Sequence, residues 1–243
     1  VVYLDGKANK EPEEVQYTYF IKFNGVSAAD LLGEQFDDFR KENKISTEDV
    51  QSLTRLHGYD VDRGMILNQA CLQYDGYMPL TKKALAAIKS RGIVKSIRPV
   101  TDKDIYTGSN YPRNSDLGWK HWTRDNYGPV WIPAKGKSIA LTMENLPVYE
   151  RCIKVYEVND LQVKGGKIFI NGKEAKSYTF KLDYYWMQGD NRHNSADSRY
   201  WGFVPEDHIV GKPLFVWWSS DPDRKGLGGI RWSRIFTWVD NIK

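Results

Sequence analysis

Residues 189–205 read GDNRHNSADSRYWGFVP and are the most informative stretch of the 243-residue chain. Six short polar side chains crowd into nine positions beside two arginines, Arg192 and Arg199. The six are Asp190, Asn191, Asn194, Ser195, Asp197 and Ser198. Side chains of these types hydrogen-bond to nearby backbone groups, so this density predicts a rigid loop that satisfies its own polar groups.

Such a loop can serve chemistry or be only an elaborate turn. Asp190 or Asp197 is placed to pair with Arg192 or Arg199, because carboxylates and guanidinium groups form strong two-point hydrogen bonds. A loop braced in this way can hold one hydroxyl, for example that of Ser195, at a fixed position. The residues alone leave both interpretations open.

The composition is that of an ordinary globular protein. Hydrophobic residues make up 41% of the chain and charged residues 27%, with a formal net charge of +4. These values exclude a disordered chain, and so small a charge argues against a nucleic-acid binder. No apolar run approaches the roughly 20 residues that span a bilayer. Because no signal peptide is visible and the chain begins at Val1, we expect a fragment or a processed protein.

The tryptophans divide the chain into two regions. All nine lie at or after Trp119, and an irregular stretch rich in Gly, Asn, Asp and Ser covers residues 101–128. The first region predicts alternating strands and helices. Strands are expected over residues 15–23, 65–74 and 93–100. Helices are expected to start at Ser27, where Asp30 completes a capping box, at Ser46 or Thr47, and at Thr81, the last ending at Gly92.

The second region predicts an all-β structure. Short β-branched or aromatic runs occur at residues 131–141, 152–156, 161–163, 167–170, 178–180, 184–187 and 214–218. The pairs Gly165-Gly166 and Asn171-Gly172 separate some of these runs and are typical of tight hairpin turns. Strands of this length and spacing predict a folded sheet or barrel.

Two segments of the chain repeat one pattern. Residues 1–8 read VVYLDGKA and residues 167–175 read KIFINGKEA. Each predicts a strand that enters a tight turn at Asp-Gly or Asn-Gly. If the segments are related, the first lacks the strand that should precede it, which suggests a truncation just before Val1. Chance similarity of two hairpins is the alternative.

The pattern G-D-N-x-x-x-S-x-D-S-R-x-x-G, matched over residues 189–202, resembles the last signature box of the type I signal peptidases. These are membrane-bound proteases that remove signal peptides from exported proteins. Val204-Pro205 and Val210-Gly211 also suit the family, and the resemblance covers roughly residues 128–218. It implies a mainly β fold, a signal-peptidase-like folded sheet or barrel, with a large inserted α/β domain.

The resemblance also implies a domain order. Residues 1–12 would contribute a strand of the β domain, and residues 13–118 would form the inserted α/β accessory domain. Residues 119–243 would complete the β domain, with the signature loop at 189–202 and a Trp-rich C-terminal cap.

The family uses a Ser nucleophile and a Lys general base. A lysine acts as a base only when neutral, so burial must lower its pKa far below ~10.4. By the resemblance, the serine that orients this base is Ser195, and Asp197 and Arg199 support that wall of the site. The residues expected to shape the loop are Gly189, Asp190, Asn191, Ser198 and Gly202.

The nucleophile and the base have no match in this chain. The family's Ser-Met-x-Pro segment is absent, and residues 142–145, TMEN, are the nearest look-alike. In the segment that resembles the Lys motif, Arg151 falls where the lysine would be, and arginine cannot lose its proton in this pH range. Lys154 is an alternative, but it is expected to be an ordinary solvent-facing lysine of a strand. We therefore expect both catalytic residues to precede Val1, and the fragment to be inactive alone.

Other residues suggest partners rather than chemistry. The spacing of His and Cys predicts no metal site, no cofactor is implied, and pairing of Cys71 with Cys152 is left open. The C-terminal region combines basic residues with Trp217, Trp218, Trp232 and Trp238. Amphipathic rings and basic side chains suit a membrane interface, but a packed cap is an equal alternative.

The sequence therefore supports three hypotheses. The first is the extracytoplasmic, periplasmic-face part of a membrane-anchored signal peptidase, a serine endopeptidase whose partners are the signal peptides of exported preproteins. The second is a non-catalytic, signal-peptidase-like binding module that kept the loop. The third is a self-cleaving repressor-type Ser/Lys peptidase, against which the Trp-rich tail and the detailed loop match argue.

Overall fold

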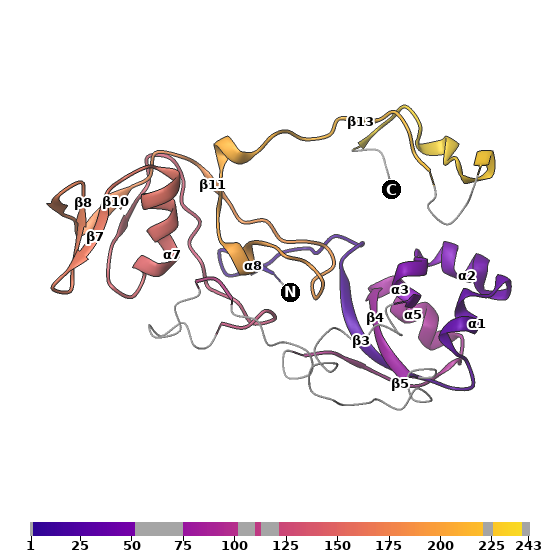
Figure 1. Ribbon diagram of the computed structural model, residues 1–243. Helices are drawn as coiled ribbons and strands as arrows, with labels where there is room; N and C mark the ends of the chain where they lie inside the picture. The colour runs from indigo at the N-terminus through magenta and orange to yellow at the C-terminus, as the bar shows by residue number, and fades with distance from the viewer. Residues whose placement is uncertain (1, 52–74, 102–109, 113–121, 221–225, 240–243) are drawn as a thin grey trace. The chain divides into compact units, whose positions relative to one another are not determined.

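The computed structural model describes residues 2–51, 75–101, 110–112, 122–220 and 226–239 (Figure 1). The chain divides into two compact units, Val1–Glu206 and Asp207–Lys243. The strands of the described residues form small antiparallel sheets of two or three strands each. The mainly β fold class with additional helices is confirmed, whereas the domain boundary near residue 118 stays a prediction.

The N-terminal part of the larger unit is an α/β structure. Strand β3 (Gln16–Phe23) lies between β4 (Asp75–Thr81) and β5 (Val94–Pro99). Figure 1 shows the helices gathered beside this sheet. They are α1 (Ala28–Leu32), α2 (Asp37–Glu42), α3 (Thr47–Gln51) and α5 (Lys82–Ser90), with a 3₁₀ turn η1 (Glu34–Phe36) before α2. Their shared core includes Ile21, Phe23, Leu31, Val50, Met78, Leu80 and Ile88.

Short polar side chains start these helices as the sequence predicts. Ser27 and Asp30 form a capping box at α1. At α3, the Ser46 N–H donates to Asp49 Oδ2 at 2.9 Å and the Asp49 N–H donates to Ser46 Oγ at 3.0 Å. Thr81 Oγ1 accepts from the Ala84 N–H at the start of α5. The strand expected over residues 65–74 lies outside the described residues.

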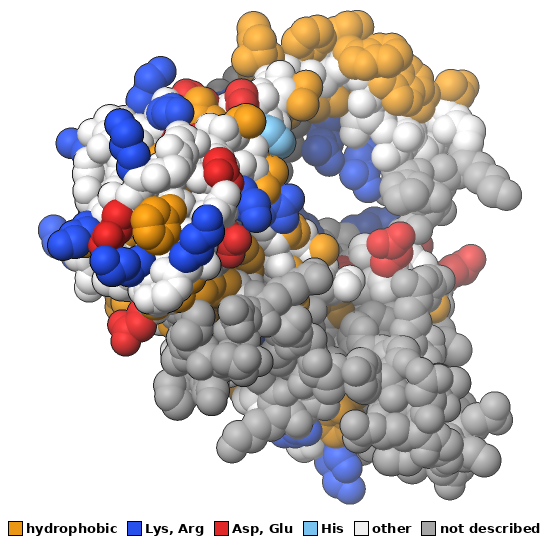
Figure 2. Space-filling model, turned by 60° about the vertical axis from the view of Figure 1, so that its left-hand side comes forward, with side chains coloured by type: hydrophobic (Ala, Val, Ile, Leu, Met, Phe, Trp, Pro, Cys, Tyr) orange, Lys and Arg blue, Asp and Glu red, His pale blue; other side chains and the backbone are white. Residues whose placement is uncertain are grey.

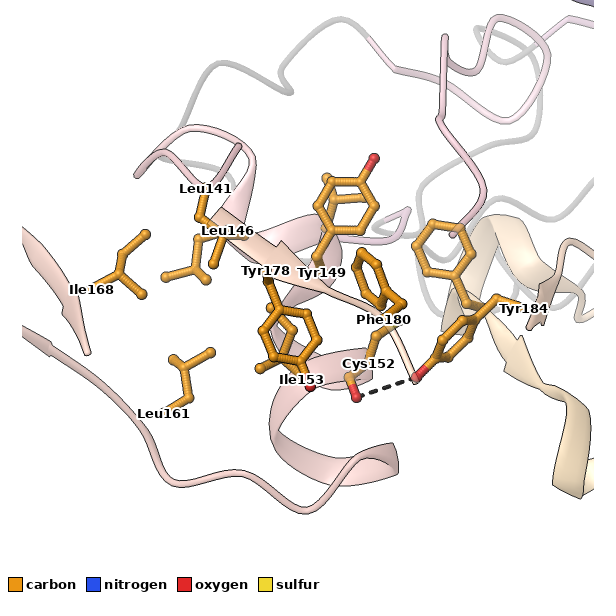
Figure 3. Close-up of a cluster of buried hydrophobic side chains, with 12 residues drawn as sticks. Leu141, Leu146, Tyr149, Cys152, Ile153, Leu161, Ile168, Tyr178, Phe180 and Tyr184 are labelled. Atoms are coloured by element: carbon orange, nitrogen blue, oxygen red, sulfur yellow. Dashed lines mark hydrogen bonds between the residues drawn. The ribbon is translucent and has the colours of Figure 1, made fainter. Parts of the chain in front are cut away.

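The second core of the larger unit is aromatic (Figure 3). The rings of Tyr149, Phe180, Tyr184 and Phe203 lie 5.8 to 6.2 Å apart in a closed cycle of neighbours. Small sheets surround this cycle. In the first, β6 (Ser138–Ala140) pairs with β10 (Ser177–Thr179). The second contains β7 (Leu161–Lys164), β8 (Lys167–Ile170) and β9 (Lys173–Glu174). In the third, β11 (Tyr184–Tyr185) pairs with β12 (Val204–Pro205).

Residues 152–156 are helical, so the strand predicted there is wrong. Helix α7 (Leu146–Arg151) continues into one π-helical turn over Cys152–Tyr156. Leu146, Tyr149 and Ile153 are buried, at the three- and four-residue spacing that one helix face presents. This spacing prevails over the β-branched character of residues 153–155. Lys154 is exposed, but on a helix and not on a strand.

The strand predicted over residues 131–141 is also mostly wrong, because only Ser138–Ala140 is extended and paired. Pro133 has no N–H to donate to a sheet, and Gly136 has a φ of +75° that turns the chain before β6. Aromatic and β-branched content alone does not make a strand where such residues interrupt it.

The two repeated segments form matching hairpins. Asp5 and Gly6 have φ values of 49° and 75°, and Asn171 and Gly172 have 51° and 80°. Both turns therefore use two left-handed residues, as a type I′ hairpin requires. Strand β1 (Tyr3–Leu4) pairs with β2 (Lys7–Ala8) across the first turn, as β8 pairs with β9 across the second. The predicted turns are confirmed, and a common origin stays a prediction.

The smaller unit is a hairpin with short helical turns. Strand β13 (Phe215–Val216) pairs with β14 (Thr237–Trp238), and 3₁₀ turns lie at η5 (Gly226–Gly229) and η6 (Trp232–Arg234). Most of its large apolar side chains are exposed, and Figure 2 shows hydrophobic side chains gathered at the top of the view. None of the helices formed by the described residues has both the length and the hydropathy that a bilayer crossing requires.

A pair of variants tests the helical assignment of residues 152–156. In a strand, Ile153 and Val155 would point to the same face, whereas in the structure Ile153 is fully buried and Val155 is 57% exposed. We expect Ile153→Ala to lower the free energy of unfolding by about 2–5 kcal/mol. Val155→Ala should change it by less than about 0.5 kcal/mol. Urea unfolding measures the free energy of unfolding of both variants. Equal decreases in this free energy would contradict the helical assignment.

Candidate functional site

An ion pair between Asp197 and Arg199 organises the signature loop. Asp197 Oδ1 accepts from Arg199 Nε at 2.8 Å, and Oδ2 accepts from Arg199 Nη2 at 2.7 Å. The two side chains are among the most buried in the chain. Asp197 Oδ2 also accepts from the Gly189 N–H at 3.1 Å, which joins the two ends of the loop. Of the pairings that the sequence leaves open, the structure therefore forms Asp197 with Arg199.

Asp197 is held in its charged form. Burial alone would raise the pKa of this carboxyl, but the hydrogen bonds and charge of Arg199, with the N–H groups of Gly189 and Arg199, outweigh it. The net result is a pKa below the usual range of aspartate. Asp197 also caps α8 (Ser198–Trp201), where it accepts from the Arg199 N–H.

Arg199 reaches two further segments of the chain. Its Nη2 donates to the Arg192 carbonyl at 2.7 Å, and its Nη1 donates to the Arg124 carbonyl at 3.3 Å. The Arg199 carbonyl in turn accepts from the Tyr111 N–H at 2.8 Å. Through its guanidinium and its carbonyl, Arg199 therefore ties the loop to two segments that lie far from it in the sequence, at Arg124 and at Tyr111.

The stem of the loop is closed by Ser198. Its Oγ accepts from the Met187 N–H at 2.9 Å, and its own N–H donates to the Met187 carbonyl at 3.0 Å. Ser198 is completely buried. Its role is thus to shape the loop, as the family resemblance implies.

Ser195 lies directly over the backbone of Gly189. A Cβ at position 189 would stand 2.1 Å from Ser195 Oγ and 2.7 Å from Ser195 Cβ, so the loop closes only because this residue is glycine. Ser195 is half-buried. Of all the hydrogen bonds formed within the described ranges, none involves the Ser195 hydroxyl.

Gly202 allows an equally close approach at the other end of the loop. It has a φ of +88°, and a Cβ there would come within 2.7 Å of the Tyr111 ring. The Tyr111 hydroxyl donates to the Val148 carbonyl in α7 at 2.5 Å. Tyr111 therefore connects the exit of the loop to the aromatic core, a role that the sequence did not reveal.

The start of the loop pairs with the α/β part of the unit. The Gln16 N–H donates to the Asp190 carbonyl at 2.9 Å, and the Arg192 N–H donates to the Gln16 carbonyl at 3.0 Å. These two bonds form a parallel bridge between Gln16 and Asn191. Asp190 contributes its carbonyl to this bridge, and Asn191 Oδ1 accepts from the Asn194 N–H at 3.2 Å within the loop.

The side chain of His193 is a buried connector. Its side chain is only 5% exposed. The Thr18 N–H donates to His193 Nδ1 at 3.1 Å, so the ring proton of the neutral form is on Nε2, which lies 2.8 Å from Asp125 Oδ1. A histidine that follows Arg192 in a loop carries no sequence signal of such a partner, because Thr18 is 175 residues away.

The look-alike catalytic segments have structural roles. Lys154 and Arg151 are exposed, so neither has the apolar surroundings that a lysine general base requires. Thr142 Oγ1 accepts from the Asn145 N–H, and Asn145 Oδ1 accepts from the Thr142 N–H, in the turn before α7. The structure therefore gives none of these residues the setting of a nucleophile or base.

No three metal-ligating side chains come together in the part of the chain that the structure describes. Cys152 is a buried free thiol, and burial raises its pKa well above the usual range. Cys71 lies outside the described residues, so the pairing of the two cysteines stays open.

Comparison with known proteins finds a similarity that covers the segment carrying the signature loop. The family model described as "Signal peptidase, peptidase S26" matches residues 141–218, which include the whole signature loop. Residues 141–218 of this chain are therefore similar to that family. Its relatives are likewise type I signal peptidases, and no solved structure matches the chain.

Three of these relatives show the extent of the similarity. Signal peptidase I of Buchnera aphidicola subsp. Acyrthosiphon pisum is 56% identical over 52 residues, 21% of this chain and 17% of its own. That of Haemophilus influenzae is 46% identical over 67 residues, 27% of this chain and 19% of its own. That of Helicobacter pylori strain J99 is 34% identical over 95 residues, 34% of this chain and 30% of its own. The matched region thus spans less than a third of each relative.

The pH dependence of stability tests the Asp197–Arg199 pair. Because the folded-state pKa of Asp197 is lowered, the pair contributes its full share to the free energy of unfolding at pH values above about 4, the pKa of an aspartate in the unfolded chain. Its contribution is lost as the pH falls through the lowered folded value. We expect Asp197→Asn to cost about 3–5 kcal/mol at pH 7, since it leaves a buried guanidinium without its partner. Urea unfolding should show that the difference in the free energy of unfolding between wild type and Asp197→Asn becomes smaller as the pH falls from 7 to 3.

Asp38→Asn is the matched control, because its side chain is 96% exposed. It should change the free energy of unfolding by less than about 0.5 kcal/mol at both pH values. A gap between wild type and Asp197→Asn that stayed constant from pH 7 to pH 3 would show that the carboxylate charge is not what stabilises the loop.

Proposed function

We propose that this chain is part of a type I signal peptidase and that Ser195 orients the lysine base of that enzyme. The observation that carries the proposal is the placement of Ser195. Its hydroxyl forms no hydrogen bond within the described residues, although the loop around it is fixed by the buried Asp197–Arg199 pair. A fixed hydroxyl without a partner is suited to bind an incoming amine.

The proposed chemistry is peptide-bond hydrolysis by a serine and a neutral lysine. Ser195 Oγ accepts a hydrogen bond from the lysine amine, which leaves the lone pair of the nitrogen free to face the nucleophilic serine and take its proton. Because Lys154 and Arg151 are exposed, we assign both catalytic groups to another part of the full-length enzyme. The substrates would be the signal peptides of exported preproteins, cut on the extracytoplasmic face of a membrane to which the enzyme is anchored.

A non-catalytic binding module is the second candidate. It is favoured by Arg151, which stands where the family has its base, and by the exposure of Lys154. The two candidates differ in one measurement on the full-length protein. An enzyme cleaves a signal peptide, whereas a binding module retains the peptide intact.

Ser195 variants of the full-length protein test the proposed role. We expect Ser195→Ala to lower kcat for a signal-peptide substrate by about 10²–10⁴-fold, a typical loss for general-base catalysis. The acid limb of the pH–rate profile should move to lower pH, because the charged ammonium form donates more strongly to the Ser195 oxygen than the neutral amine does and loses this partner in the variant. Ser195→Thr keeps a hydroxyl and should restore part of the activity.

The control is Ser177→Ala, which removes an exposed serine from β10. This variant should cleave like the wild type. An unchanged rate and pH profile for Ser195→Ala would refute the orienting role, while loss of rate without a pH shift would mean that Ser195 acts only on loop structure.

We further propose that the smaller unit contacts a membrane surface. Four of its tryptophans are more than half exposed: Trp217, Trp218, Trp232 and Trp238. Lys212, Arg231 and Arg234 belong to the same unit. Indole rings favour the headgroup region of a bilayer, and basic side chains are attracted to anionic lipids.

Vesicle binding of the chain tests this surface. We expect the double variant Trp217→Ala/Trp232→Ala to bind vesicles of neutral and anionic phospholipids several-fold more weakly than wild type in co-sedimentation. Tyr3→Ala is the control, because it removes an aromatic ring that is 64% exposed in the other unit. An equal loss of vesicle binding in Tyr3→Ala and in the double variant, or no loss of binding in the double variant, would exclude a specific membrane contact through these rings.

A further inference from the structure

A cavity of about 350 Å³ lies where the signature loop meets β3 and the end of β5. Its walls include Tyr19, Pro99, Gln188, Arg192 and His193. Because β3 pairs with the loop through Gln16, this cavity is part of the contact between the α/β and aromatic parts of the larger unit. Neither the family similarity nor the proposed chemistry assigns it a role.

Three arginines on the walls of the cavity are more than nine-tenths buried. Arg199 is 2% exposed, Arg124 is 5% exposed and Arg192 is 7% exposed. Two of them lie near a carboxylate. Arg199 is paired with Asp197, and Arg124 Nη2 lies 3.7 Å from Asp125 Oδ2.

Arg192 differs from the other two. The difference is the carboxylate, because no carboxylate of the described residues forms an ion pair with Arg192. Its Nε and Nη1 are also buried without a hydrogen-bond partner. A buried guanidinium is always charged, and burying a charge without a partner is costly. The cavity therefore has one positive charge that the described chain does not compensate.

The nearby carboxylates are already engaged. Asp125 accepts from His193 and lies beside Arg124. Glu11 accepts from the Tyr17 hydroxyl at 2.5 Å and from Lys82 at 3.4 Å. Both carboxylates accept hydrogen bonds from donors other than Arg192, so the counter-ion of Arg192 has to come from outside the described chain.

We infer that this cavity is a binding site for a carboxylate group, with Arg192 as its counter-ion. A carboxylate carries one negative charge, which balances the single uncompensated arginine. A phosphate dianion would instead leave an excess negative charge in a buried site. Tyr19 and Gln188, both half-buried on the cavity wall, supply neutral donors beside it.

The carboxylate comes either from a small free acid or from a peptide, through an acidic side chain or its C-terminus. Both sources present the same group to Arg192, and the experiment below separates them. The inference does not depend on the proposed peptidase activity, because the test measures binding and not cleavage.

Acetate titration of the whole chain tests the site. We expect acetate to raise Tm and to shift the NMR signal of the Arg192 Nε–H in a saturable manner, compared with chloride at equal ionic strength. Arg192→Gln should abolish the acetate response of Tm. In chloride alone this variant should be at least as stable as wild type, because it removes an uncompensated buried charge.

Arg98→Gln is the control for loss of one positive charge, since Arg98 is exposed on β5. It should keep the full acetate response. A competition experiment identifies the source of the carboxylate. If peptides are the natural ligands, a short peptide with a free C-terminus displaces acetate. The same peptide with an amidated C-terminus does not displace it. If neither peptide competes, the site takes free small acids.

Three results would overturn the inference. The first is a Tm response to acetate that survives in Arg192→Gln. The second is a Tm of Arg192→Gln in chloride well below that of wild type, which would mean that the chain itself already satisfies this guanidinium. The third is inorganic phosphate stabilising the protein as strongly as acetate, which would exclude a site selective for carboxylates.

Discussion

The buried ion pair of Asp197 with Arg199 is the contact on which the signature loop depends. Desolvating two charges is costly, and the structure offsets this cost with a two-point hydrogen bond and additional backbone partners for both groups. The carboxylate binds the entry of the loop at Gly189. The guanidinium binds the carbonyl of Arg192 within the loop and the carbonyl of Arg124, so a single pair holds the loop together and joins it to a distant segment.

The loop is also where the two cores of the larger unit meet. On one side it pairs with β3 through Gln16, and His193 bonds to Thr18 of the same strand. On the other side Tyr111 packs on Gly202 and bonds to α7. The placement of Ser195 is therefore a property of the whole unit and not only of the segment that carries the family pattern.

Local patterns were predictable from sequence, and contacts between distant residues were not. The caps at Ser27, Ser46 and Thr81, and the Asn171-Gly172 turn, depend on neighbouring residues, so the sequence predicted them. The strand at 152–156 was mispredicted because β-branched residues outweighed the helical spacing of Leu146, Tyr149 and Ile153. The loop residues were predicted by resemblance, but the partners of His193, Arg192 and Tyr111 come from remote segments that no local pattern reveals.

The bridge between Gln16 and Asn191 has a consequence for the order of folding. The sheet β4–β3–β5 and its helices are made from residues 16–99, whereas the loop needs partners that are separated from it by more than a hundred residues. Contacts between near neighbours in the chain form faster than remote ones, because less chain entropy is lost. The α/β part can therefore assemble early in synthesis and offer the start of β3, at Gln16, as a template on which the later loop acquires its shape.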